Sequence, residues 1–321
     1  MTSVLDSLPI VILYPHSRCN CRCQMCDIWK TDQRQEISRE QLERWLPDFE
    51  RLGVRWVVLS GGEPLMHSDL FGLCALLRRR GIRITLLTSG LLLERFAQKV
   101  VTWVDDVIVS IDGPPDVHDR IRGTPGGFAR ISHGVQAIRS LMPVSARTTV
   151  QRDNHAYLTG TARAVRELRM RSISFLAADL ASDAFNRPDH WDAARQSEIA
   201  LTTDQILVLE RELDAVKQEF GDFVLESPEK LRRIAQHFRA HLGQCEPVAP
   251  VCNAPWLSTV VESDGTMRPC FFHQPLGRIA NGDFISVLNG PQAAAFRSSL
   301  DVAGNPICRR CVCSLRAANL A

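Results

Sequence analysis

Short apolar runs alternate with amphipathic segments through the first half of the chain, and this alternation limits the possible folds more than any other feature. The six runs of strand length are residues 9–14, 56–60, 83–88, 106–111, 147–150 and 173–177. The segments between them with helical periodicity are residues 39–52, 69–80, 93–103, 128–141 and 157–169. Strands that alternate with helices form parallel βαβ units. The sequence therefore predicts an α/β fold whose parallel sheet is either doubly wound or curled into a barrel.

Chemically active residue types follow directly after four of the expected strands. They are a cysteine-rich stretch at 19–26, a glycine pair with a glutamate at 61–63, and polar turns at 88–90 and 112–113. The carboxyl ends of parallel strands lie at one edge of the sheet, which is where such folds place their active residues. We therefore expect these four segments to meet at that edge.

Three cysteines after the first strand have the spacing of an iron-sulfur loop. Cys19, Cys23 and Cys26 form the pattern C-x3-C-x2-C, while Cys21 falls outside it. Three thiolates on one short loop can ligate three corners of a cubane cluster, which leaves the fourth iron open to chelate a small molecule. The alternative is a structural zinc site, which is closed by four ligands.

Composition limits the class of protein. The chain has 321 residues, 45% hydrophobic and 23% charged, with a net charge of +2. This balance gives no basic field for nucleic acid, and no apolar stretch reaches the roughly 18 residues that span a membrane. The N-terminus has no export signal, so a cytoplasmic enzyme is expected. Most of the 11 cysteines cluster at 19–26 and 245–313, which favours metal ligands over disulfides.

The second half of the chain changes character twice. Residues 179–243 are charged and helical, with amphipathic segments at 203–220 and 228–241. After this region, proline, glycine and cysteine increase in frequency. We therefore predict a core at 1–178, a helical connecting segment at 179–243 and a small domain at 244–321.

The small domain has its own cysteine set. A β-hairpin with an Asp-Gly turn is expected at 260–270, followed by a helix at 292–300. The hairpin brings the first two ligands together, and the helix returns the chain to a C-x2-C pair. The four predicted ligands are Cys252, Cys270, Cys308 and Cys311. By spacing alone, a zinc ribbon fits as well as a second cluster.

The two motifs at the strand ends together resemble the radical S-adenosylmethionine (SAM) enzymes. The cysteine triad is followed, about 35 residues later, by the sequence Ser60-Gly61-Gly62-Glu63-Pro64. In that family the open iron holds the amino and carboxylate groups of SAM, and an electron from the cluster yields a 5'-deoxyadenosyl radical. The resemblance implies that Gly61, Gly62 and Glu63 bind the SAM amino group.

Two further segments resemble the branch that contains the molybdenum-cofactor enzyme and the SPASM/twitch proteins. They are S-x-D-G at 110–113 and H-D-x-x-R-G at 118–123. The resemblance implies that Ser110 and Asp112 contact the SAM ribose. It also implies that Arg122 pairs with a carboxylate of SAM or of the substrate.

The chain departs from the family pattern at two cofactor-binding positions. Met25 stands before the third cysteine, where an aromatic residue usually packs on adenine, and a thioether can still pack there. Thr88 begins the turn that usually reads T-N-G, but Ser89 replaces the asparagine. The SAM contact of this turn is therefore the less certain of the two.

The resemblance also implies the fold: a partial (β/α)6 radical SAM barrel followed by a small C-terminal twitch domain, built from a β-hairpin and a helix. The twitch domain holds one auxiliary [4Fe-4S] cluster on Cys252, Cys270, Cys308 and Cys311, where Cys313 could replace Cys311. The end of the chain at Ala321 is expected to leave no room for a second auxiliary cluster.

The expected reaction is hydrogen-atom abstraction from a small polar metabolite such as a sugar or aminocyclitol. The outcome is either dehydrogenation, with the auxiliary cluster taking the second electron, or epimerisation, with Cys245 as hydrogen donor. We expect a small substrate because no extension precedes the first strand. Two alternatives stay open: a peptide maturase and a non-catalytic zinc-binding protein. An external reductant such as flavodoxin or ferredoxin is expected as partner, with neither nucleic acid nor membrane.

Overall fold

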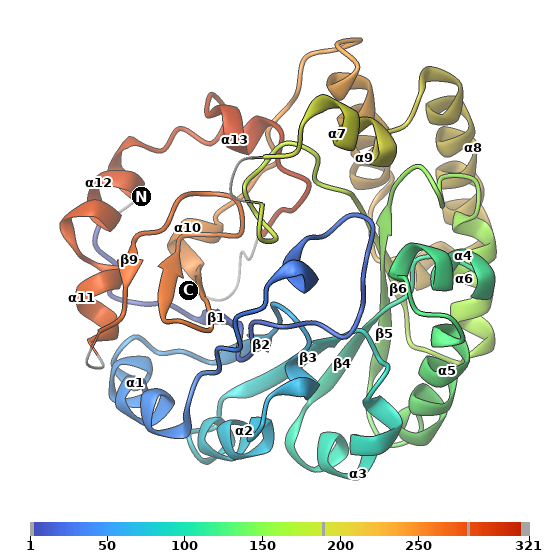
Figure 1. Ribbon diagram of the computed structural model, residues 1–321. Coiled ribbons are helices and arrows are strands. Elements are labelled where there is room, and N and C mark those ends of the chain that lie inside the picture. Colours follow the sequence, from blue (N-terminus) through green and yellow to red (C-terminus); the bar gives the residue numbers. More distant parts are fainter. Residues whose placement is uncertain (1–2, 188–189, 281–282, 316–321) are drawn as a thin grey trace.

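One curved sheet of nine strands organises the protein (Figure 1). The computed structural model describes residues 3–187, 190–280 and 283–315. The strands lie in the order β6-β5-β4-β3-β2-β1-β7-β8-β9, parallel from β6 to β7 and antiparallel beyond it. Their bounds are β1 Ile10–Leu13, β2 Trp56–Leu59, β3 Arg83–Thr88, β4 Asp106–Ser110, β5 Val144–Val150, β6 Ile173–Ala177, β7 Ser258–Val261, β8 Thr266–Arg268 and β9 Gly277–Arg278.

Helices connect the parallel strands and lie outside the sheet (Figure 1). No helix in the described part of the chain is long and apolar enough to cross a membrane. The helices of the core are α1 Arg39–Arg51, α2 Leu70–Arg79, α3 Leu93–Trp103, α4 Pro115–Arg122, α5 Gly127–Ile138 and α6 Leu158–Glu167. Those that follow β6 are α7 Ala193–Ile199, α8 Thr203–Phe220, α9 Pro228–His241, α10 Ala254–Leu257, α11 Phe284–Leu288, α12 Pro291–Ser299 and α13 Pro306–Arg309. Three short 3-10 turns are η1 Ile28–Lys30, η2 Pro64–Met66 and η3 Gly221–Phe223.

The two faces of the sheet differ in burial. Along β5, the buried residues Val144, Ala146, Thr148 and Val150 alternate with half-buried ones, and the buried set packs under the helices. Successive side chains of a strand point to opposite faces. We call the other face the inner face, and its residues on β4 and β5 are half-buried.

The predicted α/β barrel fold is confirmed, and the sheet remains open because β6 and β9 form its two edges among the described strands. The expected hairpin at 260–270 is present as β7 and β8. This hairpin joins the core sheet, since β7 pairs in parallel with β1 from Ile10↔Ser258 to Leu13↔Val261. The division into three parts at residues 178 and 243 stays a prediction. Strand β7 of the predicted third part nevertheless forms hydrogen bonds with β1 of the first part.

Local contacts set the bounds of three helices. Ser38 forms a capping box with Gln41 at the start of α1. Asp69 stands at the start of α2, but its side chain makes no cap bond and accepts from Arg39 at 2.6 Å instead. The segment before Gly123 lies outside the helices that the sequence predicts, but it forms α4, which ends where Gly123 adopts a left-handed conformation with φ of 60°.

Close packing between α3 and α5 gives a test of the fold. A Cβ atom on Gly134 would lie 2.8 Å from Cβ of Leu93. We expect Gly134→Val to lower the free energy of unfolding by about 1–3 kcal/mol, because overpacking strains both helices. The thermal midpoint should fall clearly below that of His133→Ala, an exposed neighbour on the same helix. Equal midpoints would contradict the tight contact.

Candidate functional site

The three spaced cysteines lie on the loop that leaves β1 at the carboxyl edge of the sheet. Cys23 is 6% exposed, while Cys19 and Cys26 are half-buried, and all three thiols are free. Burial raises the pKa of Cys26 to about 12. A hydrogen bond with the Cys21 thiol, together with the charge of Arg122, lowers the pKa of Cys23 to about 7 despite its burial. The loop thus presents three thiol groups within eight residues.

An ion pair beneath the loop holds Arg122 against the second cysteine. Arg122 donates through Nη1 to Sγ of Cys23 at 3.6 Å and through Nε to Oδ2 of Asp112 at 2.5 Å. The other carboxylate oxygen of Asp112 accepts from the backbone N–H of Thr149 at 2.7 Å. Both side chains of the pair are shielded, with 12% and 0% exposed. In this arrangement Asp112 and Arg122 position each other, and their predicted contacts with SAM stay predictions.

The glycine pair lets two loops approach closely. A Cβ atom on Gly62 would lie 2.1 Å from the carbonyl oxygen of Arg18, and one on Gly61 would lie 2.5 Å from the ring of Tyr14. Gly61 also has a left-handed φ of 91°. The N–H of Glu63 donates to the Arg18 carbonyl at 2.8 Å. Only glycine fits at both positions. The glycine pair is therefore needed for the chain at 61–62 to pack against Tyr14 and the cysteine loop.

The carboxylate of Glu63 connects the ends of β2 and β3. It is fully buried and accepts from the N–H of Leu65 at 3.0 Å, the hydroxyl of Thr88 at 2.8 Å and the N–H of Ser89 at 2.7 Å. Burial raises its pKa. Its predicted bond to the SAM ammonium stays a prediction. Ser89, the departure from the family pattern, donates to Asn20 in the cysteine loop at 2.9 Å.

A segment after β6 folds back over the cysteine loop, and sequence reasoning missed it. We call its described residues, 179–187 and 190–199, the strap. The backbone N–H of Asp27 donates to the Phe185 carbonyl at 3.1 Å, and Trp191 Nε1 donates to the Asp27 carboxylate at 2.7 Å. The strap therefore holds the loop at Asp27, a residue that Arg122 does not contact.

Arg187 is the buried centre of the strap. It is 2% exposed and donates to Oδ2 of Asp179 and to the carbonyl of Met25, both at 2.7 Å. Its guanidinium lies 3.5 Å from the ring centroid of Trp191. Met25 is itself buried, and its predicted contact with adenine stays a prediction. Arg187 lies in the region that the sequence shows as charged and helical, and nothing in its local pattern predicts that it is buried.

The C-terminal cysteines form a second group of neighbouring thiols. All five thiols are half-buried: Cys252, Cys270, Cys308, Cys311 and Cys313. The charges of Cys252 and Cys270 help to raise the pKa of each of the other three. Burial raises the pKa of Cys308 and of Cys313 to about 11. Cys311 donates to the Cys313 carbonyl at 2.9 Å. Five thiols are thus near one another, and the choice between Cys311 and Cys313 as fourth ligand stays open.

His273 is an additional neighbour of these cysteines. Its Nε2 lies 3.2 Å from Sγ of Cys308, its side chain is buried, and its ring packs edge-on against Phe296 at 4.9 Å. It follows Cys270 by three residues, and that short spacing was the only signal in the sequence. Hydrogen bonds to cluster sulfurs are one way in which proteins set a reduction potential.

The numbers of thiols in the two cysteine sets suit iron-sulfur clusters. The cysteines of a cubane cluster bind separate iron atoms. Three thiols in the first loop and at least four in the second match a cluster with an open iron and a closed cluster.

Two predicted site residues lie apart from these contacts. The thiol of Cys245 is 3.8 Å from the carbonyl of Gln236 on α9, and no described hydrogen bond joins it to the cysteine loop. Ser110 ends β4 and is half-buried next to Arg147 of β5. The role of Cys245 as hydrogen donor stays a prediction.

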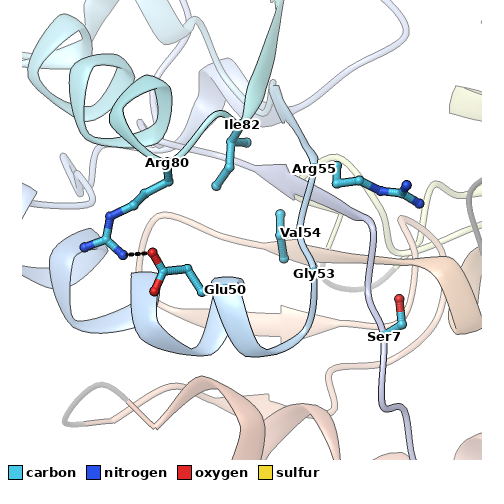
Figure 2. A pocket seen from close by; sticks show the side chains of 7 residues that line it. All are labelled: Ser7, Glu50, Gly53, Val54, Arg55, Arg80 and Ile82. Atoms are coloured by element: carbon cyan, nitrogen blue, oxygen red, sulfur yellow. Dashed lines mark hydrogen bonds and ion pairs between the residues drawn. The ribbon is translucent and has the colours of Figure 1, made fainter.

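A surface pocket lies at the opposite edge of the sheet (Figure 2). An ion pair between Arg80 and Glu50 crosses one side of it. Its lining residues are Ser7, Glu50, Gly53, Val54, Arg55, Arg80 and Ile82. These residues precede β2 and β3 in the chain, and in this class of fold residues at the amino ends of strands serve stability. The pocket is therefore separate from the cysteine site.

Comparison with known proteins agrees with this geometry. The Radical SAM superfamily matches residues 13–165, and the SPASM iron-sulfur cluster-binding domain matches residues 252–312. An AdoMet-dependent heme synthase of Methanosarcina barkeri is 31% identical over 47% of this chain and 45% of its own length. The chain therefore spans less than half of that relative.

Other similarities extend over more of the chain. The antilisterial bacteriocin subtilosin biosynthesis protein AlbA of Bacillus subtilis is 24% identical over 85% of this chain and 58% of its own. The crystal structure of Streptococcus suis SuiB bound to S-adenosylmethionine has a TM-score of 0.69, with 14% identity over 97% of this chain and 74% of that one. The second similarity shows the shared fold.

The fold and the two cysteine sets define an iron-sulfur enzyme of the open-barrel type. The chain belongs to the radical SAM superfamily and carries a SPASM-type C-terminal domain. Its cofactors are a SAM-binding [4Fe-4S] cluster, an auxiliary cluster and SAM. When bound, the first cluster and SAM supply a 5'-deoxyadenosyl radical, for which the enzyme needs a reductant. The predictions of family, fold and cofactors are confirmed.

The approach of Gly62 to Arg18 gives a test of the cysteine loop. Gly62→Ala places a methyl group against a backbone carbonyl, so we expect the loop to be displaced and the iron content after anaerobic reconstitution to fall from about eight towards about four per chain. Gly160→Ala adds the same methyl group on α6, where the nearest atom is 3.2 Å away on a side chain, and should keep all irons. Full iron content in Gly62→Ala would contradict this account.

Arg187 gives a test of the strap. Arg187→Met leaves Asp179 buried without its cation, and breaking such a pair costs about 3–5 kcal/mol. We expect faster hydrogen exchange at residues 23–27 of the reconstituted enzyme and a lower thermal midpoint. Arg163→Met, which removes an exposed pair with Glu219, should cost at most about 1 kcal/mol. Unchanged exchange in Arg187→Met would show that the strap does not hold the loop.

Proposed function

We propose that this enzyme modifies a peptide by abstracting a hydrogen atom from it. The main support is the extent of the similarity to AlbA, a bacteriocin biosynthesis protein, which covers 85% of this chain. The similarity to the heme synthase covers 47%. Since the substrate of such enzymes contacts regions outside the shared core, similarity beyond the core carries more information about the substrate.

The fold of SuiB supports the same proposal. SuiB has also been solved bound to its precursor peptide SuiA, and that structure covers 97% of this chain at a TM-score of 0.67. The shared fold extends over β7 to β9 and the cysteines that follow them. A scaffold of this extent accommodates a peptide in at least one protein.

The inner face of the sheet provides a surface for such a substrate. Its residues are half-buried on β4 and β5, between the cysteine loop and the C-terminal cysteines. We propose that the peptide lies along this face in an extended conformation. The sequence-based prediction of a sugar or aminocyclitol substrate receives less support, because no similarity that we report points to one.

The proposal is tested with peptides translated from short reading frames beside the gene. The reconstituted enzyme is incubated with each peptide, SAM and dithionite, and the peptide mass and 5'-deoxyadenosine are measured. We expect one peptide to change mass only when both SAM and reductant are present. When that peptide is prepared with deuterium in place of hydrogen on carbon, deuterium should appear in 5'-deoxyadenosine. Cys26→Ala, which removes one predicted ligand of the first cluster, serves as the inactive control.

A second fraction makes the test decisive. Metabolites from cell extract that pass a small-pore filter are supplied in place of peptides. If only this fraction gains a SAM-dependent modification and no peptide does, the substrate is a small metabolite and the peptide proposal is wrong.

A further inference from the structure

Arg147 stands on the inner face of the sheet at the middle of β5. It is half-buried, between the buried residues Ala146 and Thr148 that face the helices. The strand register pairs it with Ser110 on β4 and with Ser174 on β6. Its Nε donates to the hydroxyl of Ser174 at 3.3 Å. The guanidinium therefore lies beside the buried hydroxyl of Ser174 and next to the half-buried Ser110.

Arg147 differs from the other arginines of the strands in its ion pairing. Each of the others lies within 4.0 Å of a carboxylate. These pairs are Arg83 with Asp106, Arg268 with Glu262, and Arg278 with Asp264. Among the residues that the structure describes, Arg147 has no such ion pair, so most of its hydrogen-bonding capacity is available.

The nearest acidic groups are engaged elsewhere. Glu226 accepts from the backbone N–H of Phe175 at 2.9 Å, and burial raises its pKa. Asp179 is paired with Arg187 at 2.7 Å in the strap. Neither carboxylate forms an ion pair with Arg147 among the described residues, although the guanidinium is near enough to Glu226 for its charge to lower the pKa of that carboxyl, against the larger effect of burial.

Arg147 is near the C-terminal cysteine set, and its neighbour on β4 leads into the ion pair beside the cysteine loop. Its register neighbour Ser110 is two residues before Asp112, which positions Arg122 beside Cys23. On the other side, the charge of Arg147 reaches the thiol of Cys313. A substrate that reacts near the open iron on the inner face passes within reach of this guanidinium.

We propose that Arg147 binds a carboxylate of the substrate and so selects acidic substrates. A guanidinium offers two parallel N–H donors that match the two oxygens of a carboxylate. Since this inference rests on the proposed function, the carboxylate belongs to a glutamate or aspartate side chain of the peptide. Ser110 and Ser174 flank the site with hydroxyl groups.

The test compares two short peptides and one free dicarboxylate. Binding of acetyl-Ala-Ala-Glu-Ala-Ala-amide, its Gln analogue and glutarate to the reconstituted enzyme with SAM is measured by calorimetry. We expect the Glu peptide to bind about tenfold more tightly than the Gln peptide, because only the Glu peptide offers a charged partner. Arg147→Met should lose this preference, and Arg147→Lys should keep part of it. Arg163→Met, on the outer surface, should keep the full preference.

Each other outcome is informative. If both peptides bind equally to the unaltered enzyme, the carboxylate contact is wrong while the peptide function stands. If Arg147→Met weakens SAM binding in the absence of peptide, the cation serves SAM and the inference is wrong. If glutarate binds through Arg147 but neither peptide binds, the anion contact stands and the peptide function fails.

Discussion

The rest of the site depends on one backbone contact, in which the cysteine loop lies directly on the glycine loop. The carbonyl of Arg18 accepts from the N–H of Glu63 at 2.8 Å, and Gly62 leaves no space for a side chain between them. This contact fixes the loop to the end of β2. A long loop that carries metal ligands otherwise loses much conformational entropy when it becomes ordered. The close packing removes most of that freedom before any cofactor binds.

Buried charges complete the support of the loop from two sides. Arg122, paired with Asp112, lies beneath Cys23, and Arg187, paired with Asp179, holds the carbonyl of Met25. Breaking either pair would leave a buried charge alone, so both pairs are strongly coupled to the loop. Groups that orient the ligands of a metal centre in this way define its geometry as much as the ligands do.

The C-terminal region gains its position from the sheet. Because β7 pairs with β1, the second cysteine set is attached to the strand that leads directly into the first set. Tyr14, at the end of β1, stacks with Phe271, which follows Cys270. The inner face between the two sets is thus bounded by rigid elements, which is what a site that selects one hydrogen atom requires.

The sequence by itself determined the parallel sheet, the two cysteine sets and the class of chemistry, because apolar periodicity and ligand spacing are local patterns. The bounds Arg83–Thr88 and Leu93–Trp103 were predicted correctly. Only the tertiary structure decided which side chains support the site: Arg187 lies 162 residues from its partner Met25, and His273 lies 35 from Cys308. Such contacts depend on how distant segments pack, and no local pattern records them. The helix α4 was missed for a different reason, because its eight residues give little periodicity.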